Sequence, residues 1–161
     1  MDSSVEKVAV IGIGNLLLQD EGLGVHAVRE LERTAAREGV MFIDAGTDPW
    51  SGFAVAQDCP ALVLLDAVVG GKAPGGMYNM SLEELESGNA ALSLHGVSLL
   101  HMVQCETILG NEFRQVRVLG MEPDRVEPGI GLSDRCSARL PEFLEMSVSE
   151  IDNVRRSLEA C

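Results

Sequence analysis

Carboxylate side chains follow three short apolar runs in this 161-residue sequence, and a histidine comes later in the chain. The residues concerned are Asp20 with Glu21, Asp44, Asp66 and His95. Two carboxylates and one imidazole can bind a hard or borderline divalent cation and still leave positions open for an outside ligand. Single members of the set can also serve as an acid or base toward a substrate.

Each of these side chains also has a purely structural explanation. Asp20 can cap the helix that follows it, with Glu21 as an acid in its first turn. Asp44 and Asp66 can be turn residues at strand ends. His95, near the start of a predicted helix, can be a packing or capping residue. The pattern alone leaves both explanations open for every member.

The elements that must position these residues alternate between strands and helices. Short apolar runs predict strands at residues 7–13, 40–44, 61–66, 76–80 and 113–120. Helical patterns are expected over residues 22–37, 49–57, 93–108 and 133–161. Ser93 is the expected cap of the third helix, and the fourth is expected to break near Pro141. Residues 81–88 are predicted to be an acidic, exposed segment.

This alternation predicts an α/β fold in one domain over residues 1–161. The expected architecture is a three-layer sandwich: a mostly parallel, twisted sheet of about five strands with helices on both faces. Ligands of such folds bind outside the carboxyl ends of the strands. We therefore expect Asp20, Glu21, Asp44 and Asp66 to gather at that edge, with His95 brought there by its helix.

The glycine-rich stretch after the first strand is the most informative motif. It runs Gly12-Ile-Gly-Asn-Leu-Leu-Leu-Gln-Asp-Glu-Gly-Leu-Gly24. Two glycines fit the dinucleotide fingerprint G-x-G-x-x-G, but its third position is Leu17, and no P-loop motif occurs. Fixed carboxylates at the following helix would also repel a pyrophosphate. The motif favours a cation, and a Rossmann-like nucleotide binder is the weaker alternative.

The composition excludes several classes of partner. Twelve basic against 25 acidic residues give a net charge of −13, which argues against binding to nucleic acid or to an anionic membrane. No run reaches the roughly 18 to 20 apolar residues of a membrane helix, and the N-terminus lacks a signal-peptide pattern. The cysteines have neither C-x-x-C nor zinc-site spacing, as expected of incidental thiols in a reducing compartment. We predict a cytoplasmic protein.

Several segments together resemble the endopeptidases that mature nickel–iron hydrogenases. The stretch from Gly12 to Gly24 is similar to the signature of that family. Further similar segments are Asp44-Ala-Gly-Thr47, Leu65-Asp-Ala-Val68 with Ala73-Pro-Gly75, Ser93-Leu-His95, Met121-Glu-Pro-Asp124 and Glu127-Pro-Gly-Ile-Gly-Leu-Ser133.

The resemblance implies a function and a ligand set. The substrate would be a hydrogenase large-subunit precursor that already carries nickel, and the reaction would remove its C-terminal extension. Glu21, Asp66 and His95 would bind the nickel, or another divalent cation in its place, and form the catalytic site. Asp20 and Asp44 would be helpers, as a hydrogen-bond acceptor or a base.

The type of peptidase is left open between aspartyl and metal-dependent. The absence of H-E-x-x-H excludes a zincin, and no Ser–His–Asp or Cys–His arrangement is apparent. Chemistry at a metal ion, which activates water or polarises a carbonyl, is therefore the favoured mechanism. A non-enzymatic nickel carrier or chaperone module is the main alternative from another functional class, and it would share the same fold.

Overall fold

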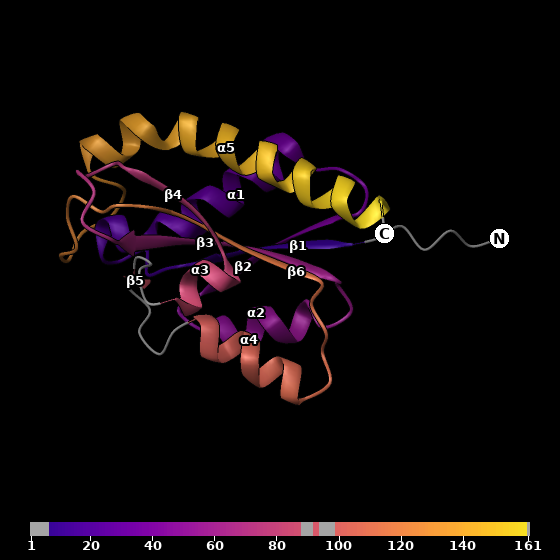
Figure 1. The fold of residues 1–161 in the computed structure, drawn as a ribbon. Coiled ribbons are helices and arrows are strands. Elements are labelled where there is room, and N and C mark those ends of the chain that lie inside the picture. The colour runs from indigo at the N-terminus through magenta and orange to yellow at the C-terminus, as the bar shows by residue number, and fades with distance from the viewer. Residues whose placement is uncertain (1–6, 88–91, 94–98, 161) are drawn as a thin grey trace.

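The protein folds as a central sheet with helices on both faces (Figure 1). The structure is a computed structural model that describes residues 7–87, 92–93 and 99–160. The strands are β1 (Val8–Ile13), β2 (Val40–Gly46), β3 (Ala61–Val69), β4 (Met77–Ser81), β5 (Leu92–Ser93) and β6 (Gln115–Met121). The main sheet has the order β2-β1-β3-β6-β4, in which only the pair β4–β6 is antiparallel, and β5 pairs with the end of β3. The predicted mostly parallel sheet of about five strands is confirmed.

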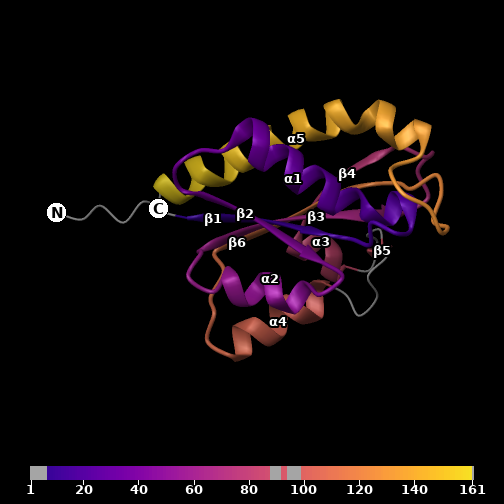
Figure 2. The ribbon, with the colours of Figure 1, turned by 180° about the vertical axis from the view of Figure 1, so that it is seen from behind.

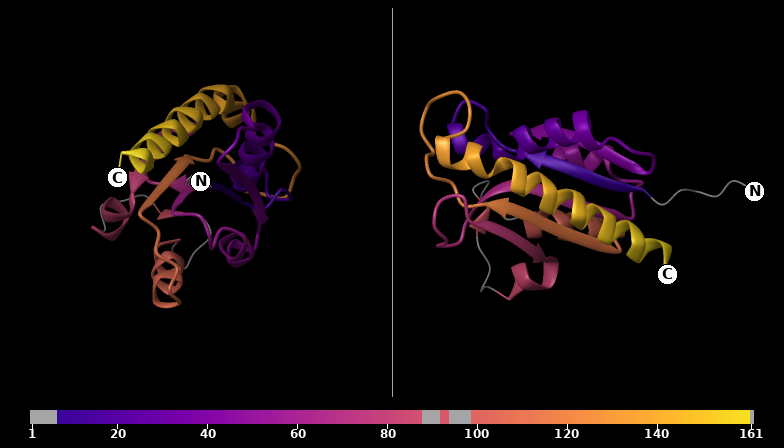
Figure 3. Two further views of the ribbon diagram at one scale, coloured as in Figure 1. Left: turned by 90° about the vertical axis from the view of Figure 1, so that its right-hand side faces the viewer. Right: turned by 90° about the horizontal axis from the view of Figure 1, so that it is seen from above.

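The helices form the two outer layers. One face of the sheet is covered by α1 (Leu23–Ala35) and α5 (Asp134–Glu159), which lie side by side in Figures 1 and 3. The other face carries α2 (Pro49–Val55), α3 (Leu82–Glu86) and α4 (Leu99–Ile108), as the view from behind in Figure 2 shows. The expected three-layer sandwich is therefore confirmed. No helix in the described parts of the chain is long and apolar enough to cross a membrane.

The strands at the centre are apolar on both faces because both faces are covered. Every residue of β1 is buried, and in β3 only Val69 is exposed. Side chains alternate along β3: Val63 and Leu65 pack under α1 and α5, whereas Leu62 and Leu64 pack toward α2 and α4. This alternation also fixes the face on which a polar residue of the same strand lies.

Two of the predicted helices differ from the sequence prediction, one at its start and one in its interior. Ser93 does not cap a helix, because its backbone lies in β5 and pairs with Val68. The helix predicted from residue 93 is confirmed over Leu99–Ile108, while residues 94–98 lie outside the described residues. The expected break at Pro141 is wrong, since α5 runs without interruption from Asp134 to Glu159. The apolar stripe that α5 buries against the sheet outweighs the one backbone hydrogen bond that a proline removes.

The strand order places a topological switch point between β1 and β3. The chain leaves β1 through α1 and returns at β2 on one side of it, and then crosses through α2 to β3 on the other side. In open α/β sheets the crevice outside the carboxyl ends of two such strands is the usual ligand site.

Candidate functional site

Glu21 and Asp66 lie on elements that meet at this switch point. Glu21 belongs to η1 (Gln19–Gly22), a short 3-10 helix between β1 and α1 that packs against β3. Asp66 is completely buried in β3, one step beyond Leu65, the last residue of β3 that pairs with β1. The strand continues beyond Asp66 to Val69, so the predicted strand end at residue 66 marks only the end of the pairing with β1.

Two glycines of the signature motif press the start of α1 onto the sheet beside Asp66. A Cβ atom on Gly24 would lie 2.1 Å from the carbonyl oxygen of Leu65 and 2.3 Å from that of Ile13. A Cβ atom on Gly12 would lie 2.2 Å from the carbonyl oxygen of Gly24. These glycines therefore serve helix-to-strand packing, and the same packing holds η1 close to β3.

Asp20 does not cap α1, although its position in the sequence allows it. The N-cap of α1 is Gly22, and no side chain caps the helix. The buried carboxylate of Asp20 instead accepts hydrogen bonds from the backbone N–H groups of Asp124, Arg125 and Ser133, at 2.9, 2.8 and 2.7 Å. The hydroxyl of Ser133 donates a further bond at 2.7 Å and is itself the N-cap of α5. Asp20 thus ties the signature motif to residues 122–132, which we call the late loop.

These hydrogen bonds also determine the charge of Asp20. Burial by itself would raise the pKa of the carboxyl group, but the N–H groups of Arg125 and Ser133, with the Ser133 hydroxyl and the N–H of Asp124, lower it below its ordinary value. Asp20 is therefore an anion with a structural task.

Asp20→Asn is expected to destabilise the protein by about 3 kcal/mol, because an amide offers one oxygen in place of two and turns its NH2 group toward N–H donors. Urea denaturation measures this difference. Glu127→Gln, at an exposed acid of the same late loop, is the control and should change stability by less than about 0.5 kcal/mol. A D20N variant as stable as the parent would show that the carboxylate does not hold the loop.

Asp44 lies at the same edge of the sheet but on the other face from Asp66. It accepts a hydrogen bond from Arg29 of α1 at 2.7 Å and one from the N–H of Gly46 at 3.0 Å. By the alternation along β3, the side chain of Asp66 faces α2 and α4. Gly12 pairs with Asp44 on one side and with Leu65 on the other, so two strand spacings, roughly 10 Å, separate the two positions. The structure does not bring Asp44 beside Asp66.

The third member of the predicted trio, His95, lies outside the described residues. Within the residues that are described, no group of three His, Cys, Asp or Glu side chains is arranged to hold a metal ion. The geometry therefore brings together the elements of Glu21 and Asp66, and the complete trio stays a prediction.

Comparison with known proteins identifies the family. A sequence profile described as hydrogenase maturation protease matches residues 25–150. The chain belongs to the hydrogenase maturation protease family. The hydrogenase 2 maturation protease of Escherichia coli K12 is 29% identical over 148 residues, which cover 90% of each chain. HupM of Azotobacter chroococcum, a hydrogenase expression/formation protein, is 30% identical over 153 residues, or 92% of this chain and 73% of HupM. The solved structure of the hydrogenase maturating endopeptidase HybD from E. coli aligns with a TM-score of 0.80 at 27% identity and covers 92% of this chain and 93% of HybD.

Besides Asp20 and Asp66, a third buried carboxylate, Glu122, lies at this edge, and the sequence pattern did not single it out. Glu122 follows β6 and accepts hydrogen bonds from the N–H of Gly70, at 2.9 Å, and from the hydroxyl of Tyr78. Burial raises the pKa of Tyr78, and the bond to Glu122 raises it further. The N–H of Lys72 donates to the same hydroxyl at 3.1 Å, so the cluster fixes the loop between β3 and β4. The only sequence signal was the place of Glu122 in Met121-Glu-Pro-Asp124.

His26 of the maturation protease lies on α1 with its Nε2 buried and without a hydrogen-bond partner among the described residues. Burial lowers its pKa, the positive charge of Arg29 lowers it further, and the charge of Asp20 offsets this only in part. The unfolded chain takes up a proton at the ordinary pKa of 6.5, whereas the folded protein takes it up only at lower pH. The contribution of His26 to stability is therefore complete above pH 6.5 and is lost as the pH falls toward the folded-state pKa.

His26→Gln is expected to remove this pH dependence. The stability of the parent relative to the variant should decrease between pH 7.5 and pH 5.5, as measured by urea denaturation at several pH values. Because the other titrating groups are common to both proteins, their effects cancel in the difference. A difference that stays constant over this range would contradict the assignment.

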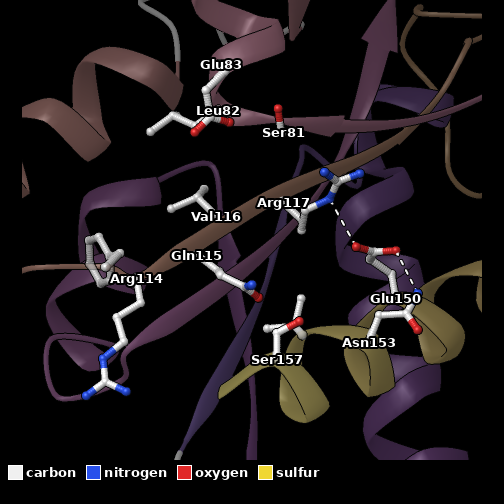
Figure 4. Close-up of a pocket in the computed structure, with 12 residues that line it drawn as sticks. Ser81, Leu82, Glu83, Arg114, Gln115, Val116, Arg117, Glu150, Asn153 and Ser157 are labelled. Atoms are coloured by element: carbon white, nitrogen blue, oxygen red, sulfur yellow. Dashed lines mark hydrogen bonds and ion pairs between the residues drawn. The ribbon is translucent and has the colours of Figure 1, made fainter. Parts of the chain in front are cut away.

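A hollow of about 410 Å³ in the protease lies away from the switch point, at the amino end of β6 (Figure 4). Across it, Arg117 of β6 forms an ion pair with Glu150 of α5 at 3.0 Å, and Asn153 donates to the same carboxylate at 3.4 Å. These side chains satisfy one another's charges and hydrogen-bonding groups across the contact between β6 and α5. The hollow is at the edge opposite to Glu21 and Asp66, so it does not belong to the candidate site.

Proposed function

We propose that this maturation protease is an endopeptidase that removes the C-terminal extension of a nickel-loaded hydrogenase large-subunit precursor. The observation that supports it most is the meeting of η1, which carries Glu21, with β3, which carries buried Asp66, at the switch point of the sheet. The names of its relatives agree with an action on hydrogenase.

In this proposal, Glu21, Asp66 and His95 bind nickel that arrives with the precursor. Carboxylate oxygens and an imidazole are suitable ligands for nickel. Three ligands from this protein leave coordination positions on the nickel for ligands that the precursor itself supplies. The strand pairing agrees with this choice of ligands. The strand β5 ends shortly before His95 in the sequence, and it pairs with β3 just after Asp66.

The chain would contribute position and charge to the hydrolysis. The carboxyl side chains of Glu21 and Asp66 are carried by elements that cannot easily move apart, because Gly12 and Gly24 bring the backbones of α1, β1 and β3 into close contact. The nickel would polarise the scissile carbonyl or the attacking water. The protein would hold the scissile carbonyl beside the metal. The reacting groups would then already be oriented, so the reaction would not depend on a chance encounter between them.

The deciding experiment compares nickel-loaded with nickel-free precursor. Each is incubated with the purified protease, and the products are weighed by mass spectrometry. Loss of the C-terminal extension from the loaded precursor alone is the expected result. Equal cleavage of both would refute guidance by nickel, and tight binding of the loaded precursor without cleavage would instead support a carrier.

His95→Ala is expected to block processing of the loaded precursor while the melting temperature changes little, because it removes one proposed ligand. The comparison uses the same mass measurement together with thermal denaturation. Processing by the variant at the rate of the parent would remove His95 from the site.

A further inference from the structure

A groove of about 410 Å³ lies next to η1 at the carboxyl edge of the sheet. Gln19 of η1 forms one wall, residues 124–125 and 130–132 of the late loop form another, and the first residues of α5 close the end. Neither the packing of the core nor the proposed ligand set uses this groove.

The walls of the groove are held in place by hydrogen bonds between segments far apart in the sequence. The N–H of Gln19 donates to the carbonyl of Gly129 at 3.2 Å, and the N–H of Gly129 donates to the carbonyl of Leu17 at 2.9 Å. Asp20 anchors the rest of the late loop beneath the groove. A ligand would therefore meet a surface that is already ordered, which lowers the entropy cost of binding.

Gln19 has two features that packing alone does not explain. Its φ of +50° lies in the left-handed region, and it is the only residue other than glycine with a positive φ in the described parts of the chain. Its side-chain oxygen is buried with no hydrogen-bond donor among the described residues. Strain and an unsatisfied acceptor both cost free energy, and such costs concentrate at binding sites. A primary amide both donates and accepts, as a peptide unit does.

Apolar side chains project from the same rigid loops. Ile130 is 85% exposed and lines the groove, and Leu17, whose carbonyl bonds to Gly129, is 65% exposed. Large apolar groups that an ordered backbone holds in water are typical of protein-binding surfaces.

The charges around the groove balance. Asp124 and Asp134 line it together with Arg125 and Arg135. A lining of mixed sign does not select a strongly anionic or cationic ligand, and it suits a peptide whose recognition rests on backbone hydrogen bonds and apolar contact.

We propose that this groove binds the C-terminal extension of the precursor as an extended peptide, with an apolar side chain against Ile130 and a backbone amide at Gln19. Gln19 and Glu21 lie on the same turn of η1, roughly 4 Å apart along the helix axis, so a chain cut beside Glu21 enters the groove within a residue or two. The inference rests on the proposed function and adds to it the place where the extension is recognised.

The test uses two variants, Ile130→Ser and Gln19→Ala, and nickel-loaded precursor as substrate. Ile130→Ser is expected to raise KM about tenfold with less than a twofold change in kcat, because it removes apolar burial. Gln19→Ala should raise KM severalfold. Ile108→Ser, at a residue that is 84% exposed at the end of α4 and far from the groove, is the matched control and should leave both constants unchanged.

A binding measurement separates the extension from the body of the precursor. Nickel-loaded precursor and the same protein without its extension are titrated against immobilised protease. The two groove variants are expected to weaken binding of the full precursor and to leave binding of the truncated form unchanged. Equal weakening for both forms, or an unchanged KM, overturns the assignment of the groove. A parent protein that fails to cleave loaded precursor overturns the proposed function instead.

Discussion

Asp66→Asn is expected to reduce processing of nickel-loaded precursor by at least about a hundredfold, with stability changed by only about 1 kcal/mol. The amide keeps the shape of the buried side chain and the oxygen that accepts the N–H of Ala67 at 2.8 Å. It removes the negative charge that a divalent cation requires. The readout is the mass of the products, with urea denaturation as the measure of folding.

Glu21→Gln should act in the same way and should also weaken binding of Ni²⁺ in calorimetry. Asp48→Asn is the matched control, because Asp48 is an exposed acid that precedes α2 and makes no side-chain cap there. It should process precursor at the parental rate. If Asp48→Asn lowers processing as much as Glu21→Gln does, the effect comes from the overall negative charge of the protein and not from a defined site.

The three layers of the fold, and the edge of the sheet at which the candidate site lies, were predictable from the sequence because they follow from the local pattern of apolar residues. Continuous apolar runs, such as that of β3, are typical of strands covered on both faces, and the apolar stripe of α5 has helical spacing. Once the strands are parallel, their carboxyl ends must share an edge. The meeting of η1, which carries Glu21, with β3, which carries Asp66, follows from this topology without knowledge of any single contact.

The partners of Asp20 were not predictable, since they lie more than a hundred residues further along the chain. A side chain with a carboxylate just before a helix is ambiguous between a local cap and a tertiary anchor, and only the fold decides. Asp44 illustrates the same limit, because its pairing with Arg29 depends on where α1 crosses β2.

One missed element did have a local signal. Residues 81–88 were expected to be an exposed acidic segment, yet they contain α3, with Ser81 and Glu84 as a reciprocal capping box. The spacing Ser-x-x-Glu marks such a start in the sequence alone. The acidic composition of this segment is equally typical of an exposed loop, so only the capping pattern distinguishes the helix.

Gly24→Ala is expected to have the largest effect on stability, about 4 kcal/mol or more. The added methyl group would lie 2.1 Å from the carbonyl oxygen of Leu65, and backbone atoms at that distance cannot move aside as a flexible side chain can. Since Leu65 sits between β1 and β6 in the middle of the sheet, the strain can be relieved only by displacement of α1. Urea denaturation followed by circular dichroism measures the loss.

Gly110→Ala distinguishes this clash from the ordinary cost of replacing a glycine. Gly110 has a φ of +97°, but a Cβ atom there would meet nothing within 4 Å, so the variant should lose only about 1 kcal/mol. If both variants lose the same free energy of unfolding, Gly24 is not needed for the close packing of α1 against the sheet. If the loss at Gly24 is much larger, the folded fraction of that variant should also process precursor slowly, because displacement of α1 carries η1 and Glu21 away from Asp66.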